Sequence, residues 1–233
     1  MKHHLKGYNA PTSWPIKRKK TRYTGKPTPG PYALNESITL SLIIIEWLKH
    51  AKNLREVKII LNDGKVLINK KIIKDHKFPA GLFDVIELPD LKETYRIGIN
   101  SYGKLAITKI NGTNKKVYKI NNKTILKNGR TQLNLTGGRN IIVKETNFRT
   151  GDSIIFDHEN KKIVKHLKLE NGARIFLNKG KHAGNVGTLE GMNKYEGMRK
   201  TDIKIKSKNG HIETLKEYGI VIDDSIEEAQ WKQ

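Results

Sequence analysis

The sequence predicts an α+β protein that is mostly β and is divided into several small domains. Helical periodicity is confined to residues 38–62, short strand patterns separated by turns fill residues 65–169, and a glycine-rich strand region follows from residue 172. The apolar content of 36% and the aromatic content of 7% allow only small cores in a chain of 233 residues. We therefore expect a helix pair with a small sheet, a central small antiparallel β-barrel and a C-terminal SH3-like barrel.

The net charge limits the class of partner. Lys and Arg number 45 against 23 Asp and Glu, which gives a formal charge of +22. Self-repulsion of this size favours binding to a polyanion, and a nucleic acid is the natural one. A membrane surface is the weaker alternative, because the cations are spread along the chain and do not line one amphipathic helix. Since no apolar stretch could span a bilayer and no signal-peptide core is present, we expect a soluble, intracellular protein.

Residues 1–36 are predicted to form a basic, extended arm. The part before residue 33 has eight cations, five of the seven prolines and no acidic residue, so it should not fold alone and should order only on its partner. Its aromatic side chains could stack on unpaired bases while its cations neutralise phosphates, although a flexible solubilising tail is the alternative. The candidate RNA contacts in this arm are Lys6, Trp14, Lys17, Arg18, Lys19, Lys20 and Arg22.

Two helices are predicted after the arm. The first covers about residues 38–51, with Lys49 at its end. The second begins at Asn53, which forms a capping-box pattern with Glu56, and Gly64 ends it. Free backbone N–H groups at the helix start and clustered cations would bind a nucleic-acid backbone. The candidate contacts of this pair are Lys49, Lys52, Arg55, Lys58 and Lys65.

Strand patterns fill most of the remaining chain. Residues 65–73 alternate and are expected to form a strand, or a hairpin that turns near Asn69 and Lys70, followed by a strand over residues 82–88. Seven short strand patterns lie between residues 94 and 169, and turn signals such as Asn128-Gly129 separate them. Short strands at this spacing predict the central antiparallel barrel.

A glycine-rich loop is the most distinctive feature of the third unit. Gly180, Gly184 and Gly187 follow an apolar strand and allow tight backbone bends. The exposed part of the loop should carry Lys179, Lys181 and His182. The loop could serve only as a turn of the barrel, or it could also lie against RNA phosphate, and the net charge favours both uses together.

No catalytic constellation is present in the sequence. HExxH, GxSxG and Walker A patterns are missing, and the absence of cysteine excludes thiolate catalysis and cysteine-based zinc sites. Pseudouridine synthases often carry a similar RNA-binding module, but the nearest match to their Gly-Arg-Leu-Asp motif, residues 129–134, has no carboxylate. Asp84 and Asp152 stand beside turns, where hydrogen bonds to backbone are the commoner role. We expect no enzymatic activity, metal, cofactor or small-molecule substrate.

Several stretches resemble one ribosomal family. Residues 37–88 look like the S-four-type RNA-binding module, with Lys70 in place of the usual final Gly of its strand motif. Residues 178–190 look like a KOW motif. The N-terminal and central signatures are similar to those of ribosomal protein S-four-e, a small-subunit protein of archaea and eukaryotes; they are residues 4–6 (HLK), 10–14 (APTSW), 29–31 (PGP) and 78–86 (FPAGLFDVI).

This resemblance implies a cytoplasmic, structural constituent of the small ribosomal subunit, of the compact archaeal form. Its partners would be small-subunit ribosomal RNA and neighbouring ribosomal proteins, and it would support RNA folding and assembly for translation. Two alternatives stay open, an RNA-modifying enzyme and a KOW-type transcription elongation factor. The expected domains are the arm (1–36), the S-four-type module (37–93), a central β domain (94–170), a KOW domain (171–222) and an acidic tail (223–233).

Overall fold

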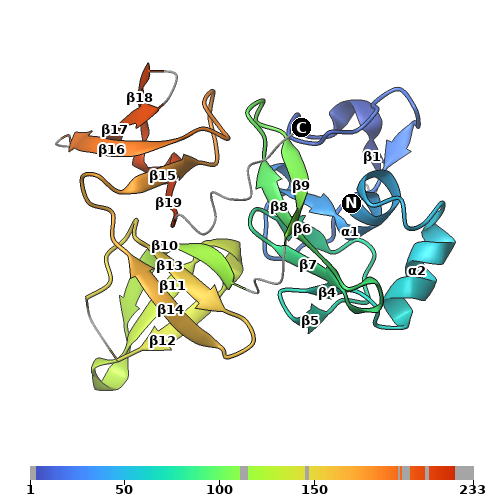
Figure 1. Cartoon of the computed structure of the whole chain (residues 1–233), viewed down its shortest axis with the longest axis horizontal. Helices are drawn as coiled ribbons and strands as arrows, with labels where there is room; N and C mark the ends of the chain where they lie inside the picture. The colour runs from blue at the N-terminus through green and yellow to red at the C-terminus, as the bar shows by residue number, and fades with distance from the viewer. Residues whose placement is uncertain are drawn as a thin grey trace. The chain divides into compact units, whose positions relative to one another are not determined.

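The computed structural model is mostly β, with one pair of short helical segments, as the sequence predicts (Figure 1). By its internal contacts the chain divides into two compact units, one formed mainly by residues up to 114 and the other mainly by residues from 115 onward. Of the predicted acidic tail, residues 224–233 lie outside the part of the chain that the structure describes. The described residues are 4–110, 115–144, 147–193, 195, 200–207 and 210–223.

The sheet of the first unit has five antiparallel strands in the order β5-β4-β7-β8-β9. Asn69 and Lys70 join the first two strands with φ values of 50° and 63°, so the predicted hairpin is confirmed as a two-residue turn with both residues left-handed. The boundary expected between residues 93 and 94 falls inside β8. The strands are β4 (Leu67–Ile68), β5 (Lys71–Ile72), β7 (Val85–Leu88), β8 (Glu93–Ile99) and β9 (Leu105–Ile110).

The first helical segment is shorter than the sequence predicts. Strand β3 (Ser37–Thr39) precedes it and pairs with β6 (Pro79–Gly81). Helix α1 (Leu40–Leu42) then continues into a π-helical stretch, η3 (Ile43–Trp47). The expected start at residue 38 is wrong because β3 is fully buried and its backbone pairs with a strand distant in sequence. The left-handed φ of 56° at Lys49 follows the end of the segment.

Helix α2 (Leu54–Asn62) has the predicted boundaries. Asn53 caps its first turn, and Gly64 follows its last turn with a φ of 74°. Val57 and Leu61 are fully buried on its inner face.

The N-terminal segment is part of the first unit and is not an extended arm. Strand β1 (Leu5–Lys6) pairs antiparallel with β2 (Tyr23–Thr24). The Trp14 side chain is only 2% exposed, and its indole N–H donates to the carbonyl oxygen of Ser37 at 2.6 Å. The prediction of disorder rested on average composition, whereas a few buried apolar anchors hold the segment in place.

The second unit contains two five-stranded antiparallel sheets. The central sheet has the order β12-β11-β10-β13-β14, and the C-terminal sheet has the order β18-β17-β16-β15-β19. Each sheet has its own apolar core, centred on residues such as Leu133 and Ile154 in the first and Ile175 and Ile203 in the second. The central strands are β10 (Lys115–Ile125), β11 (Thr131–Leu135), β12 (Asn140–Val143), β13 (Ser153–Asp157) and β14 (Lys162–Leu167). The C-terminal strands are β15 (Arg174–Leu177), β16 (Val186–Asn193), β17 (Asp202–Ser207), β18 (Gly210–Leu215) and β19 (Gly219–Val221).

A buried lysine connects these two sheets. The Lys119 ammonium of β10 donates to the carbonyl oxygens of Lys216, Glu217 and Gly219 at 2.8, 2.8 and 2.7 Å. The first two carbonyls belong to the turn that leads into β19, and Gly219 is the first residue of β19. The three N–H donors of the ammonium therefore each have an acceptor, which removes much of the cost of burying the charge.

Candidate nucleic-acid interface

The start of α2 carries the first candidate RNA contacts. The Asn53 Oδ1 atom accepts from the backbone N–H groups of Arg55 and Glu56 at 2.9 and 3.1 Å. The Glu56 carboxylate in turn accepts from the backbone N–H of Lys52 at 2.7 Å. The predicted Asn53 cap is confirmed, whereas the Glu56 carboxylate bonds the backbone N–H of Lys52 and the side-chain amide of Asn53 instead of the Asn53 backbone N–H of a capping box. The Asn53 side chain thus occupies two of the backbone N–H groups that were expected to bind phosphate, which leaves the exposed cationic side chains as the main groups for an anion here.

The side chains at this end of α2 form the α2 cation cluster, defined as Lys52, Arg55 and Lys58. All three are exposed, and within the described residues none of them forms an ion pair. Lys65 differs, because its ammonium lies 3.5 Å from Asp63 and 3.8 Å from Asp90. The α2 cation cluster therefore has more uncompensated charge than the end of the helix. Lys49 is also exposed, beyond the end of η3.

The potential of the cluster reaches a neighbouring histidine. Burial lowers the pKa of His76 below its usual range, Asp75 opposes this shift, and the positive charges of Lys58 and Lys77 add to it. His76 is accordingly mainly neutral at pH 7, and the local charge comes from the lysines.

Two of the predicted N-terminal contacts have structural roles instead. Trp14 is buried, so its ring offers no face for a base to stack on. The Arg18 guanidinium is occupied by three backbone carbonyl groups of the same segment, those of Tyr8, Ala10 and Pro11. Sequence reasoning missed both roles because they depend on contacts between chain segments. The remaining predicted cations of this segment are exposed, namely Lys6, Lys17, Lys19, Lys20 and Arg22.

Exposed tyrosines are the aromatic groups that this segment offers. Tyr8 is 67% exposed and Tyr23 is 46% exposed. The Arg22 guanidinium carbon lies 5.4 Å from the centre of the Tyr23 ring, which places a cation and a π-face together on the surface. Base stacking, if it occurs here, belongs to these two rings and not to Trp14.

The glycine-rich loop of the second unit connects β15 and β16. Gly180 and Gly184 have φ values of 83° and 90°, and a Cβ atom at Gly184 would collide with the backbone carbonyl of Asn100. Gly187 lies against Ile205 and the Lys206 carbonyl. The glycines thus set the shape of the loop. Lys179 and Lys181 are exposed and His182 is partly buried.

Asp84 and Asp152, the acidic residues considered as catalytic candidates, form hydrogen bonds that stabilise the fold. Asp84 is 1% exposed and accepts hydrogen bonds from the Gly81 backbone N–H at 2.7 Å and the Asn69 amide at 2.6 Å. Asp152 accepts from the backbone N–H of Leu169 at 3.0 Å and lies 2.8 Å from His166 Nε2. Their predicted role beside turns is confirmed. Over the described ranges, no group of three or more His, Cys, Asp or Glu residues could hold a metal ion.

The chain is similar to known proteins over nearly the whole length of both sequences. The chain is 36% identical over 230 residues to the small ribosomal subunit protein eS4 of Methanococcus aeolicus, covering 95% of this chain and 94% of the relative. It is 34% identical over 232 residues to the protein of the same name from Methanocaldococcus jannaschii, covering 96% and 95%. The chain belongs to the ribosomal S4e family.

Two further comparisons agree with S4e membership. The model of ribosomal family S4e matches residues 91–163, and that of the RS4NT (NUC023) domain matches residues 1–35. The crystal structure of the 30S ribosomal protein S4e from Thermoplasma acidophilum superposes with a TM-score of 0.69 at 28% identity, covering 82% of this chain and 97% of that one. The S4e resemblance predicted from the sequence is therefore confirmed, and the relatives named here are archaeal. In the part of the chain that the structure describes, no helix is long and apolar enough to cross a membrane.

Proposed function

We propose that this S4e protein is a non-enzymatic, structural constituent of the small ribosomal subunit, and that it binds ribosomal RNA and supports its folding and assembly. The observation that carries the proposal is the α2 cation cluster, whose three exposed side chains have no carboxylate partner within the described residues. Phosphate groups neutralise such a cluster and release the counterions of the RNA. Full-length similarity to proteins named as small-subunit components supports the choice of ribosomal RNA as the partner.

The proposed RNA contacts are spread over several surfaces. The α2 cation cluster and the N-terminal lysines belong to the first unit, whereas the glycine-rich loop belongs to the second. Lysine side chains on flexible stems hold a phosphate without reading the base, so we expect little sequence readout. In the cytoplasmic ribosome the protein would also contact neighbouring ribosomal proteins. The proposed contacts are Lys6, Lys17, Lys19, Lys20, Arg22, Lys49, Lys52, Arg55, Lys58, Lys179, Lys181 and His182. Lys65, expected from the sequence, is not among them because its ammonium lies near Asp63 and Asp90.

Salt-dependent binding tests the RNA contact. The dissociation constant for small-subunit ribosomal RNA should rise steeply with salt, and Arg55→Ala or Lys58→Ala should each reduce the slope of log K against log salt by about 1. Lys65→Ala is the matched control, because two carboxylates already compensate this lysine. Charge reversal of Arg55 and Lys58 together should weaken binding without abolishing it. Salt-insensitive binding, or an equal effect of Lys65→Ala, would contradict the proposal.

Two experiments separate this function from the alternatives. Mass mapping of RNA after incubation with the protein should find no modified nucleotide, whereas modification with turnover would indicate an RNA-modifying enzyme. Sedimentation of a cell extract after a high-salt wash should find the protein with the small subunit. Co-purification with RNA polymerase instead would indicate an elongation factor.

A further inference from the structure

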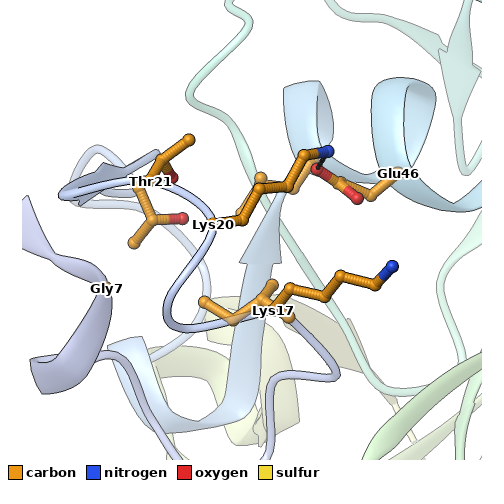
Figure 2. A pocket seen from close by; sticks show the side chains of 8 residues that line it. Gly7, Lys17, Lys20, Thr21 and Glu46 are labelled. Atoms are coloured by element: carbon orange, nitrogen blue, oxygen red, sulfur yellow. Dashed lines mark hydrogen bonds and ion pairs between the residues drawn. The ribbon is translucent and has the colours of Figure 1, made fainter.

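A small pocket lies beside the turn at residues 17–20 of the N-terminal segment (Figure 2). Its polar lining is formed by Lys17, Lys20, Thr21, Thr24 and Glu46. Its volume of about 30 Å³ compares with the roughly 10–15 Å³ that one buried water requires on the same measure. The pocket therefore has room for about two oxygen atoms and excludes a nucleobase.

The turn that carries the two lysines is held by Arg18. The guanidinium donates to the carbonyl oxygens of Tyr8 and Ala10 through Nη1, at 3.0 and 2.9 Å, and to that of Pro11 through Nη2, at 2.9 Å. The turn is closed by the Lys20 backbone N–H, which donates to the Lys17 carbonyl at 3.0 Å. Arg18 thus points toward the backbone while the lysines on either side of it are exposed.

The backbone leaves little freedom around these contacts. A Cβ atom at Gly7 would lie 2.9 Å from the Arg18 carbonyl oxygen, so the β1 end of the segment approaches the turn closely. Figure 2 shows the Lys17 and Lys20 side chains extending in the same direction from the turn. The backbone that carries the two lysines is therefore held in place before any ligand binds, which reduces the entropy lost by the turn on binding.

One carboxylate shares the pocket with the lysines. Glu46 Oε1 lies 3.2 Å from Lys20 Nζ, and both side chains are partly exposed, at 36% and 59%. An ion pair with this exposure is weak and is screened by salt. Lys17 has no ion pair among the described residues. Glu46 therefore occupies one lysine and leaves the other available for an anion.

We propose that this pocket receives the two non-bridging oxygen atoms of one RNA phosphate between Lys17 and Lys20, that the phosphate displaces Glu46 from Lys20, and that Arg18 is a positioning residue. The proposal rests on the proposed function and assigns a site to it. Thr21 and Thr24 are among the lining residues, but the Thr21 hydroxyl already donates to the Tyr23 carbonyl oxygen at 2.9 Å. The proposed phosphate contacts are therefore the two ammonium groups. A phosphate between two ammonium groups would be compensated more fully than one at a single exposed lysine.

Lysine substitutions in the full-length protein test the pocket. With small-subunit ribosomal RNA at several salt concentrations, Lys17→Ala should weaken binding several-fold and reduce the salt slope by about 1. Lys19→Ala is the control in the same turn, because Lys19 is exposed and does not line the pocket. Its effect should be smaller. Equal effects of the two substitutions on RNA binding would overturn the proposal that the pocket binds a phosphate.

The role of Glu46 gives a second readout with the opposite sign. Glu46→Gln should tighten RNA binding, because the carboxylate no longer competes for Lys20. This gain should disappear when Lys20→Ala is also present, since the two residues act on the same interaction. If Glu46→Gln still tightens RNA binding when Lys20→Ala is present, Glu46 weakens binding only by long-range repulsion of the phosphate. That result would overturn the proposed displacement of Glu46 from Lys20.

Arg18 is tested by its conservative variant. Arg18 makes its three carbonyl contacts from two nitrogen atoms, Nη1 and Nη2, whereas the three donors of a lysine share one nitrogen on a side chain without the planar fork. If Arg18 positions the turn, Arg18→Lys should therefore not restore all three contacts, and RNA affinity should fall nearly as far as in Arg18→Ala. If Arg18 instead contacts phosphate, Arg18→Lys should keep most of the affinity, which would overturn the positioning role. Circular dichroism on each variant checks that the fold is retained.

The RNA-binding measurements also separate failure of the proposed function from failure of the pocket. If the wild-type protein does not bind the RNA, the proposed function is rejected. If the wild-type protein binds and Lys17→Ala leaves binding unchanged, only the pocket is rejected.

Discussion

Lys119 shows how a single buried charge can organise part of this S4e protein. Lys119 is 7% exposed, and its three hydrogen-bond acceptors are backbone carbonyl groups from the turn before β19 and from the first residue of β19. A hydrogen bond to a charged group typically contributes a net stabilisation of about 1.5–3 kcal/mol. Lys119 therefore couples the central sheet to the C-terminal sheet of the same unit.

The stability of the protein should depend on pH through this residue. Burial lowers the pKa of Lys119 to about 8, and the charge of Lys216 adds to this effect. The pKa in the unfolded chain is about 10.4. Between these pH values the unfolded state binds more protons than the folded state, so the free energy of unfolding rises with pH through this group. Below pH 8 both states are protonated and the contribution is constant.

The variant Lys119→Met isolates this contribution. The difference in unfolding free energy between wild type and Lys119→Met should shift in favour of wild type from pH 8 to pH 10, by at most about 1.4 kcal/mol per pH unit. Urea unfolding followed by circular dichroism at pH 7.5, 8.5 and 9.5 measures it. A shift in the opposite direction would mean that the carbonyl groups hold the proton more strongly than burial expels it.

At the scale of elements, strand β16 contains a matched pair of glycines. A Cβ atom at Gly187 would lie 2.5 Å from the Lys206 carbonyl oxygen and 2.5 Å from Ile205 Cγ2, whereas nothing lies within 4 Å of the corresponding position at Gly191. Gly187 faces β17 closely, because the two strands pair at Ser207. A methyl group can be accommodated at one position and not at the other.

We therefore expect different effects from the same substitution in this strand. Gly187→Ala should lower the free energy of unfolding by about 1–3 kcal/mol, the range for overpacking. Gly191→Ala should change it by less than about 0.5 kcal/mol. Denaturant unfolding of both variants measures the difference. Equal effects would show that the Gly187 contact yields without cost.

At the scale of the whole molecule, the N-terminal segment is part of the first unit. Trp14 is buried and bonded to Ser37, and the Ser13 carbonyl accepts from the backbone N–H of Leu105 in β9 at 2.8 Å. The segment therefore supports the sheet as well as carrying cations. Removing it does not isolate its electrostatic contribution to RNA binding.

Deletion of residues 1–36 should destabilise the first unit. Truncating a buried aromatic residue alone costs about 3–5 kcal/mol. The deletion should therefore lower the midpoint of thermal unfolding by several degrees or abolish the transition of this unit. The double substitution Lys17→Ala and Lys19→Ala should leave the midpoint unchanged, since both side chains are exposed. An unchanged midpoint after deletion would contradict the structural role of the segment.

The sequence by itself determined the features that depend on short-range interactions. The Asn53 cap, the stop at Gly64 and the turn at Asn69 and Lys70 are all as predicted. Each is decided by residues close in sequence, because capping and turn conformation are local. The basic composition and the S4e signatures could also be recognised from the sequence alone, because neither depends on contacts between distant segments.

Only the tertiary structure decided which residues of these patterns face inward. It placed β3 in a strand pair with β6, buried Trp14 and directed Arg18 toward backbone carbonyl groups. Burial and pairing between segments far apart in sequence outweigh local propensity, so neither composition nor periodicity could predict them. For the same reason the sequence identifies the cationic residues, but only the fold shows which of them bond to backbone carbonyl groups, as Arg18 and Lys119 do, and which stay exposed on the surface.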